Sequence, residues 1–162
     1  MGAKWPMVEA ADSTRPEYSH TQKAPLCLLI YALAVVFLAL GWIVQDAPPI
    51  HWLFPAIGLL MLVVAASFHH LTVEDQGDVL SVRFGPVPLF RKTVQYSDIV
   101  KVEVGRTLLF DGWGIHMSIR GGWVWNLWGR DCAVVHLKKG TLRIGTDDAE
   151  NLAVFLGSRV VT

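Results

Sequence analysis

The chain has 162 residues, of which 52% are hydrophobic and 17% charged, and its formal net charge is zero. Its mean hydropathy of +0.40 is high for a soluble domain. A neutral chain lacks the overall basic charge on which non-specific nucleic-acid binding depends, so composition does not indicate a nucleic-acid partner.

Two apolar stretches without Asp, Glu, Lys or Arg occupy residues 26–44 and 53–68. As helices they would be about 28 and 24 Å long, close to the ~30 Å hydrocarbon thickness of a bilayer. The remaining chain is too short to bury two such helices in a soluble core, so we expect both to cross a membrane. The connection at residues 46–51 is short and contains two prolines, so the second helix must return antiparallel beside the first.

Basic residues flank this predicted hairpin but are absent from its connection. Three precede the first stretch and three follow the second: Lys4, Arg15 and Lys23, then Arg83, Arg91 and Lys92. The positive-inside rule therefore predicts a multi-pass protein of the cell inner (plasma) membrane with both termini in the cytoplasm. Small residues of the first helix would allow close packing against a membrane-protein partner or a second copy, as a homo-oligomer: Ala32, Ala34, Ala39 and Gly41.

Outside the hairpin, the sequence predicts a tail and a β-rich domain. Residues 1–24 mix charged residues, Pro, Ser and Thr without periodicity, and we interpret them as a flexible N-terminal tail. After residue 70, short β-type runs alternate with turn residues, which predicts an antiparallel sheet or barrel at 71–162 that folds independently of the hairpin at 25–70. The runs lie at residues 71–73, 79–84, 89–94, 99–109, 113–119, 123–127, 132–137 and 141–144.

Local patterns predict the details of this domain. The alternating segment at residues 100–104 should place its valines on one buried face. Gly121-Gly122 and Lys139-Gly140 should form hairpin turns, because glycine accepts a positive φ. Residues 147–156 start with acidic side chains and should form a helix whose N-cap is Thr146 or Asp147. Its apolar face should pack on the sheet through residues at helical spacing: Leu152, Phe155 and Leu156.

Residues 112–156 resemble a known family in several short motifs. The motifs are Gly112-Trp113-Gly114-Ile115, Arg120-Gly121-Gly122-Trp123, Trp125-Asn126, residues 129–134, Lys139-Gly140 and residues 144–148. They resemble those of bacterial pleckstrin-homology-like (PH-like) domains, which often follow one or two membrane helices. The resemblance covers roughly residues 71–157 and implies an α+β fold, with the two-helix transmembrane hairpin followed by a seven-stranded PH-like antiparallel β-barrel and a C-terminal helix. The fold hosts many binding roles, so it implies no particular ligand.

Aromatic and basic residues suggest a partner-binding surface. Three tryptophans are framed by two arginines: Trp123, Trp125 and Trp128, with Arg120 and Arg130. Trp123 and Trp125 share one strand face, and Trp128 lies on the opposite face unless a bulge intervenes. Such tryptophans either fill the core of a small domain or present a surface to a partner protein or to the bilayer interface.

Three further basic residues suggest a lipid site. Arg83, Arg91 and Lys92 flank the turn at residues 85–89, where the resemblance to PH domains implies headgroup recognition. The loop is short and contains two prolines, so a solvated basic edge is the alternative interpretation. Each of these residues would gain about 1 kcal/mol near an anionic leaflet even without a specific pocket.

The remaining polar groups do not predict catalysis, a metal site or a cofactor. The sequence has no recognisable nucleophile elbow, phosphate loop or dinucleotide motif. Two clusters of polar residues have structural interpretations that are simpler than a metal or catalytic site. We interpret His116, Cys132 and His136 as a buried thiol with partly exposed histidines. We interpret Asp147, Asp148 and Glu150 as the acidic first turn of a helix. We therefore expect a non-enzymatic, membrane-anchored binding module that scaffolds, assembles or regulates a membrane protein complex. The alternative is a membrane module that senses an anionic lipid.

Overall fold

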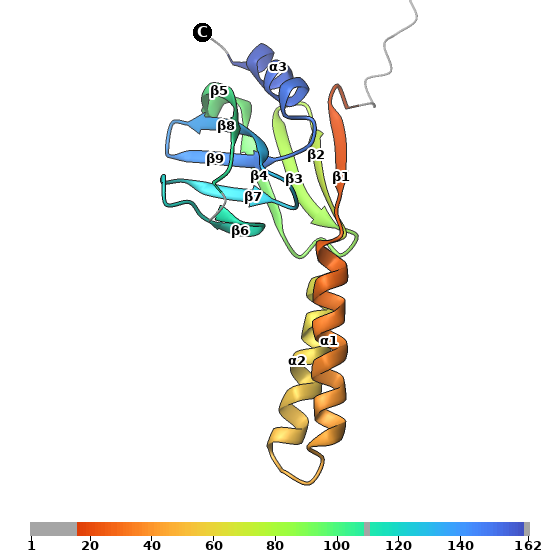
Figure 1. The fold of residues 1–162 in the computed structure, drawn as a ribbon. Coiled ribbons are helices and arrows are strands. Elements are labelled where there is room, and N and C mark those ends of the chain that lie inside the picture. The colour runs from red at the N-terminus through yellow and green to blue at the C-terminus, as the bar shows by residue number, and fades with distance from the viewer. Residues whose placement is uncertain (1–15, 109–110, 161–162) are drawn as a thin grey trace, which may run out of the picture.

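The computed structural model describes residues 16–108 and 111–160. Helices α1 (Leu26–Ile43) and α2 (Ile50–Ser67) project together from a domain made of two sheets and a third helix (Figure 1). Both helices are long and apolar enough to cross a membrane, and only 17% of each span is buried. They are therefore not core helices of the domain, and the predicted pair of apolar helices is confirmed.

Small residues let α1 and α2 pack closely along their length. Ala34 and Gly41 of α1 and Gly58 of α2 are buried between the helices. A Cβ atom added at Gly58 would lie 3.1 Å from the Ala34 carbonyl oxygen, so a larger residue would push the helices apart. Ala34 and Gly41 pack within the hairpin, and contact between the first helix and a partner helix stays a prediction. Ala32 and Ala39 lie on the exposed side.

The strands form two separate sheets. Their orders are β1-β2-β3-β4 and β5-β8-β9-β7-β6, and within the described part of the chain no pairing closes the two sheets into a barrel. Each of the eight predicted runs contains a strand, and the mixed α+β class is confirmed. One pair, β7 with β9, is parallel rather than antiparallel. The strands are β1 (Ser19–Lys23), β2 (His70–Asp75), β3 (Val79–Gly85), β4 (Arg91–Gln95), β5 (Ile99–Arg106), β6 (Gly114–Met117), β7 (Trp123–Asn126), β8 (Asp131–Leu137) and β9 (Thr141–Gly145), with the short 3-10 helix η1 (Tyr96–Asp98) before β5.

Strand β1 corrects both the predicted tail and the predicted domain boundary. It precedes α1 in the chain, yet it pairs with β2, with Thr21 opposite Thr72. The two threonine hydroxyl oxygens are 2.9 Å apart. The polar sequence of β1 lacks the apolar alternation that predicts a strand, because an edge strand has one neighbour and can keep much of its surface in water. A cut at His70 would therefore remove a strand from the domain. Residues 1–15 of the predicted tail lie outside the described residues.

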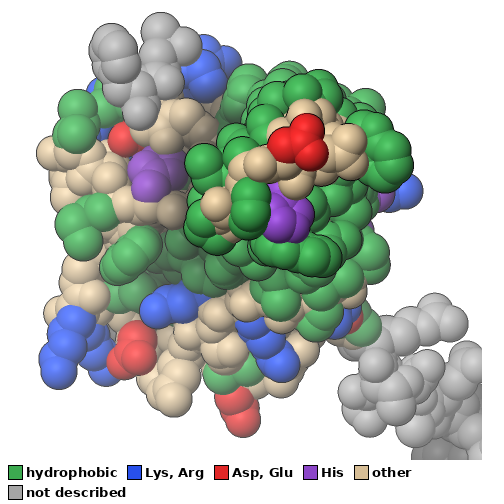
Figure 2. Space-filling view, turned by 90° about the horizontal axis from the view of Figure 1, so that it is seen from below, with side chains coloured by type: hydrophobic (Ala, Val, Ile, Leu, Met, Phe, Trp, Pro, Cys, Tyr) green, Lys and Arg blue, Asp and Glu red, His purple; other side chains and the backbone are tan. Residues whose placement is uncertain are grey.

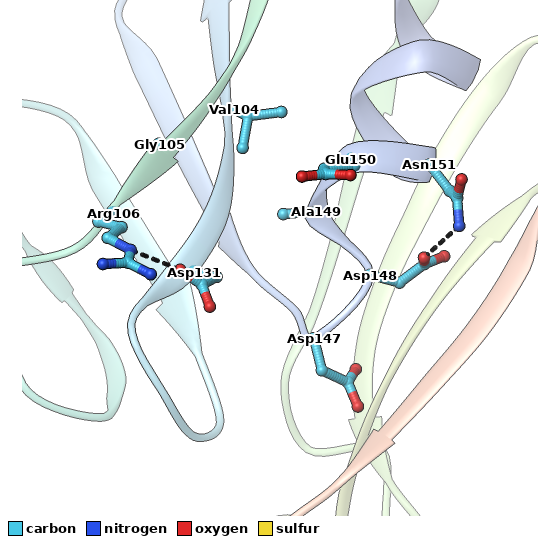
Figure 3. Close-up of a pocket in the computed structure, with 9 residues that line it drawn as sticks. All are labelled: Val104, Gly105, Arg106, Asp131, Asp147, Asp148, Ala149, Glu150 and Asn151. Carbon is cyan, nitrogen blue, oxygen red and sulfur yellow. Dashed lines mark hydrogen bonds and ion pairs between the residues drawn. The ribbon is translucent and has the colours of Figure 1, made fainter.

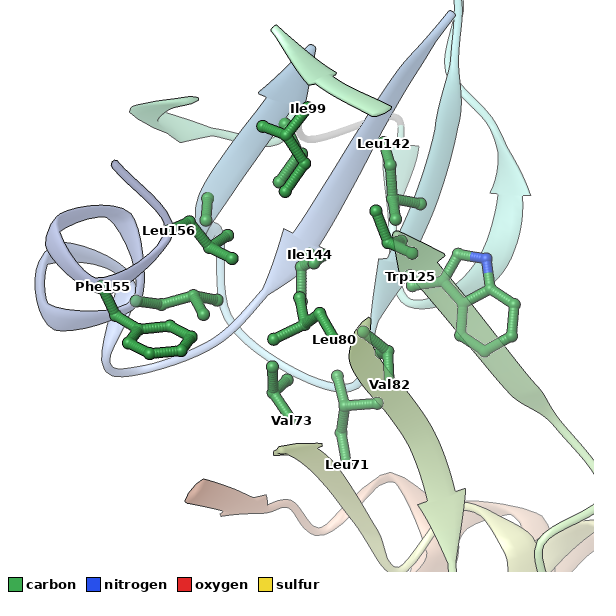
Figure 4. Packing of buried hydrophobic residues seen from close by; sticks show 14 of the residues in the cluster. Leu71, Val73, Leu80, Val82, Ile99, Trp125, Leu142, Ile144, Phe155 and Leu156 are labelled. Atoms are coloured by element: carbon green, nitrogen blue, oxygen red, sulfur yellow. The ribbon is translucent and has the colours of Figure 1, made fainter. Parts of the chain in front are cut away.

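The core lies between the two sheets and helix α3 (Ala149–Arg159), as Figure 4 shows. Leu152, Phe155 and Leu156 of α3 are buried, so the predicted apolar face is confirmed. The N-cap is Asp148 rather than Thr146 or Asp147. The Thr146 hydroxyl oxygen instead accepts a hydrogen bond from the Asp148 N–H at 3.1 Å.

Strand β5 is less covered than its alternating sequence predicts. Val104 lies opposite the buried Ala133 of β8, yet 54% of its surface is exposed. The register shifts between Ile99 and Lys101, which leaves Val100 outside the ladder. Because β5 is the edge strand of its sheet, no further strand covers these valines.

Candidate binding surfaces

The structure places the residues of the predicted sites on separate surfaces. We use the name slot for a hollow of about 370 Å³ between loops at the ends of β6 and β7, lined by Leu108, Gly112, Trp113, Trp128, Gly129 and Arg130. We use the name groove for a hollow of about 400 Å³ between β4 and the β6–β7 hairpin, lined by Leu89, Phe90, Arg91, Lys92, Ile115, Trp123 and Trp125. The predicted tryptophan group is therefore divided, with Trp128 in the slot and Trp123 and Trp125 in the groove. Two of the predicted lipid-binding residues, Arg91 and Lys92, also line the groove.

Two stacked indole rings form one wall of the slot. The ring centroids of Trp113 and Trp128 are 4.1 Å apart, and the ring planes differ by 19°. Trp113 is 46% exposed and Trp128 is 37% exposed, so the pair presents apolar surface to a ligand. Trp113 was not among the predicted site residues. Its position beside a glycine turn is the signal that could have identified it.

A buried amide holds the two loops of the slot together. Asn126 is fully buried, and its Nδ2 donates hydrogen bonds to the carbonyl oxygens of Gly112 at 3.3 Å and Gly129 at 3.0 Å. Both glycines have positive φ angles, of 61° and 77°, which their turns require. Gly145 lies against the Asn126 side chain and leaves no room for a Cβ atom. Asn126 is therefore a positioning residue of the slot that the sequence did not reveal.

Backbone contacts fix the loop that carries Arg130. The Arg130 carbonyl oxygen accepts a hydrogen bond from the Thr107 N–H at 2.7 Å. The side-chain Nε of Arg130 donates a hydrogen bond to the Thr107 carbonyl oxygen at 3.3 Å. Nearby, burial alone would raise the pKa of Asp111. Hydrogen bonds from the Leu108 N–H and the Ser118 hydroxyl outweigh burial, and they hold that pKa below its usual value. Arg130 thus supports the slot through its two hydrogen bonds with the backbone of Thr107.

The groove lies between β4, an edge strand of the first sheet, and strands β6 and β7 of the second sheet. Trp125 is only 8% exposed and packs on Phe84 with ring centroids 5.8 Å apart, so its core interpretation is correct. Trp123 lies on the same face of β7 but is 48% exposed. Lys92 lies two residues before the buried Val94 on β4, so both side chains leave the strand on the same, inner face, where the groove lies. Two predicted cations, Lys92 and Arg91, and two predicted tryptophans therefore line the groove.

Arg83 and Arg120 line neither hollow, and Arg91 reaches the groove only at its rim. Arg83 and Arg91 stand opposite each other on the outer face of the first sheet. Arg83 donates to Glu74 at 3.4 Å, and Arg91 donates to the Gln76 side-chain oxygen at 3.2 Å. Arg120 is exposed on the β6–β7 turn, away from the lining of both hollows. The structure therefore does not bring Arg120 and Arg130 together around one tryptophan cluster, and partner binding by these residues stays a prediction.

The acidic residues at the start of α3 line a third hollow, of about 470 Å³ (Figure 3). Their carboxylates point in different directions, and His20 lies within ion-pair distance of both Asp147 and Asp148. The Asp147 carboxylate is 2.6 Å from the His20 ring nitrogen, and the Asp148 carboxylate accepts hydrogen bonds from Tyr18 at 3.0 Å and Asn151 at 2.5 Å. Burial and the bond to Asp148 raise the Tyr18 pKa well above its usual value. These carboxylates attach the β1 segment to α3.

The histidine and cysteine residues of the sheet have individual environments. The His136 ring nitrogen lies 3.2 Å from a Glu103 carboxylate oxygen. Cys132 is fully buried, and burial raises the pKa of its thiol to about 11. In residues 16–108 and 111–160, no three His, Cys, Asp or Glu side chains are grouped so that they could hold a metal ion.

Comparison with known proteins does not assign the chain to a family. No model of a known protein family matches it, and no curated protein matches it either. The resemblance to PH-like domains therefore stays a prediction, and the features that point to a function are the two hollows and their position relative to the helix pair.

Proposed function

We propose that the protein is a membrane-anchored, non-enzymatic PH-like binding module that holds a partner membrane protein in its slot. In this role it scaffolds, assembles or regulates a membrane complex. Following the charge asymmetry around the hairpin, we place it in the inner membrane with the domain and both termini in the cytoplasm. Two sheets capped by a C-terminal helix support the PH-like assignment, although their edges stay unpaired.

The exposed tryptophan pair carries this proposal. Stacked indoles beside glycine turns offer a preformed apolar surface, and tryptophan is the residue most enriched among those that dominate binding energy at interfaces. The Asn126 hydrogen bonds hold the surface in place before a partner arrives, which lowers the entropy cost of binding.

The slot also lies near the membrane end of the domain. Gln22 of β1 donates a hydrogen bond to the Trp128 carbonyl oxygen at 3.3 Å, and β1 leads directly into α1 at Leu26. A segment of another membrane protein that leaves the bilayer beside this hairpin can therefore reach the slot. This position favours a membrane-protein partner over a soluble one.

The test uses the full-length protein, crosslinked in its native membrane and purified with its partners. We expect Trp113→Ala or Trp128→Ala to reduce recovery of a defined partner at least tenfold, because each removes half of the stacked pair. Trp123→Ala is the matched control, since it removes a half-exposed indole outside the slot. Unchanged recovery in both slot variants, at an unchanged thermal midpoint, would contradict the proposal.

A second candidate function is recognition of an anionic lipid. It is favoured by Lys92 and Arg91, which line the groove together with apolar side chains. Arg83, the third predicted residue, has Glu74 as a neighbour on the outer face of the sheet and does not line the groove. Recognition of an anionic lipid by the full-length protein would appear as preferential retention of phosphatidylglycerol over phosphatidylcholine during purification.

A further inference from the structure

The groove lies on the side of the domain that faces the membrane. Its Leu89–Phe90 wall belongs to the β3–β4 loop, and the Phe90 ring lies 5.6 Å from that of Phe68, the residue that follows α2. Its other wall belongs to β6 and β7, and β6 is the strand of the second sheet nearest the helix pair (Figure 1). Short links of two residues join β1 to α1 and α2 to β2, so the domain cannot stand away from the bilayer.

The view from the helix end supports this position. Hydrophobic side chains continue from the helix pair onto the underside of the domain, with Lys and Arg side chains among them (Figure 2). Leu89 is 50% exposed and Met117 of β6 is 65% exposed. Exposed apolar side chains that adjoin two membrane spans are suited to the interfacial layer of the bilayer rather than to water.

The chemistry of the groove matches an amphipathic anion. Ile115 and Trp123 supply apolar surface on one wall, and the other wall combines the apolar ring of Phe90 with the positive charge of Lys92. None of the described residues that line the groove is acidic. Lys92 forms no ion pair with any residue in the described part of the chain, whereas Arg91 donates to a neutral amide oxygen. The charge of Lys92 is therefore free to bind an anion from the adjoining leaflet.

We propose that the groove binds one anionic phospholipid drawn from the adjoining leaflet. The lipid phosphate contacts Lys92, with Arg91 at the rim, and the glycerol and the first part of an acyl chain lie over Ile115 and Trp123. This proposal rests on the second candidate function and adds its site. It commits to a lipid rather than a peptide for two reasons. Through Phe90 and Phe68 the groove adjoins the end of α2, and Lys92 and Arg91 line it together with apolar side chains and no acidic residue.

The experiment measures lipid retained by the full-length protein. The protein is reconstituted into vesicles of equal phosphatidylglycerol and phosphatidylcholine, purified in mild detergent, and its bound lipids are counted per chain. We expect about one phosphatidylglycerol per chain, and at least a fivefold loss in Lys92→Gln and in Ile115→Glu. Lys139→Gln, a charge change on the exposed β8–β9 turn, is the matched control and should retain the lipid. A phosphatidylglycerol with a photoreactive acyl chain should label residues 114–126.

Each outcome has a distinct meaning. Loss in the two groove variants together with labelling of residues 114–126 supports the proposal. Retention of phosphatidylglycerol in Lys92→Gln, or an equal loss in Lys139→Gln, overturns the groove as the site while leaving lipid recognition standing. No preference for phosphatidylglycerol in the wild type overturns both. Because Lys92 is exposed, its replacement by Gln should leave the thermal midpoint unchanged, so a loss of lipid in that variant does not reflect misfolding.

Discussion

Phe155 of α3 connects three parts of the domain, and replacing it by Ala is the sharpest test of the fold. Its ring stacks on Tyr18, which precedes β1, with centroids 5.2 Å apart and an 18° angle between the planes. It meets the Tyr96 ring edge to face at 6.2 Å, and the Arg159 guanidinium lies 5.3 Å from its centroid. The side chain is only 9% exposed, so the substitution would leave a cavity under the helix.

We expect Phe155→Ala to lower the free energy of unfolding by about 3 kcal/mol, the lower end of the usual range for a buried phenylalanine. The lower end applies because the ring lies at the edge of the core, where α3 can settle into part of the space. For a domain of this size, such a loss lowers the thermal midpoint by roughly 12–24 °C.

The midpoint can be followed by tryptophan fluorescence of the full-length protein in detergent micelles. Val154→Ala is the matched control, because Val154 directly precedes Phe155 on the same helix and is 75% exposed. It should change the midpoint by no more than a few degrees, about 0.5 kcal/mol. A drop for Phe155→Ala no larger than that of the control would show that α3 does not cover the core.

Three further predictions concern the turn, the membrane junction and the topology. Gly122→Ala should lower the free energy of unfolding by at least about 1 kcal/mol more than Gly121→Ala does. Both glycines have positive φ, but only a Cβ at position 122 would collide with a backbone carbonyl of β9. Thermal unfolding of the two variants measures the difference. Burial, together with neighbouring positive charges, lowers the pKa of His70, so the unfolded chain binds its proton more readily. Domain stability should therefore fall as the pH drops below about 6.5, and His70→Asn should flatten this dependence; an unchanged pH profile would contradict the burial of the imidazole. A cysteine at Pro49 should react with an impermeant thiol reagent from outside the cell and one at Gly140 should not, and the reverse pattern would invert the assigned topology.

Local signals in the sequence were sufficient for most elements of the fold. The charge-free stretches predicted α1 and α2, because a membrane span depends on composition over a fixed length and needs no knowledge of neighbours. The spacing of Leu152, Phe155 and Leu156 predicted the buried face of α3 for a similar reason, since helical periodicity is a property of the segment itself. Turn glycines divided the strands correctly, because a positive φ is a requirement of a single residue.

The tertiary structure decided which segments become neighbours. Strand β1 was missed because its stability comes from pairing with β2 across the intervening hairpin, and a polar edge strand carries little signal of its own. Spacing along the sequence also could not predict which site residues would line the same hollow. Trp128 and Trp123 are close in sequence but belong to different hollows, whereas Lys92 and Trp123 are distant in sequence and line the same groove. Sequence determines which side chains are present and which face of their own strand they occupy, but the packing of one sheet edge against another determines which of them meet.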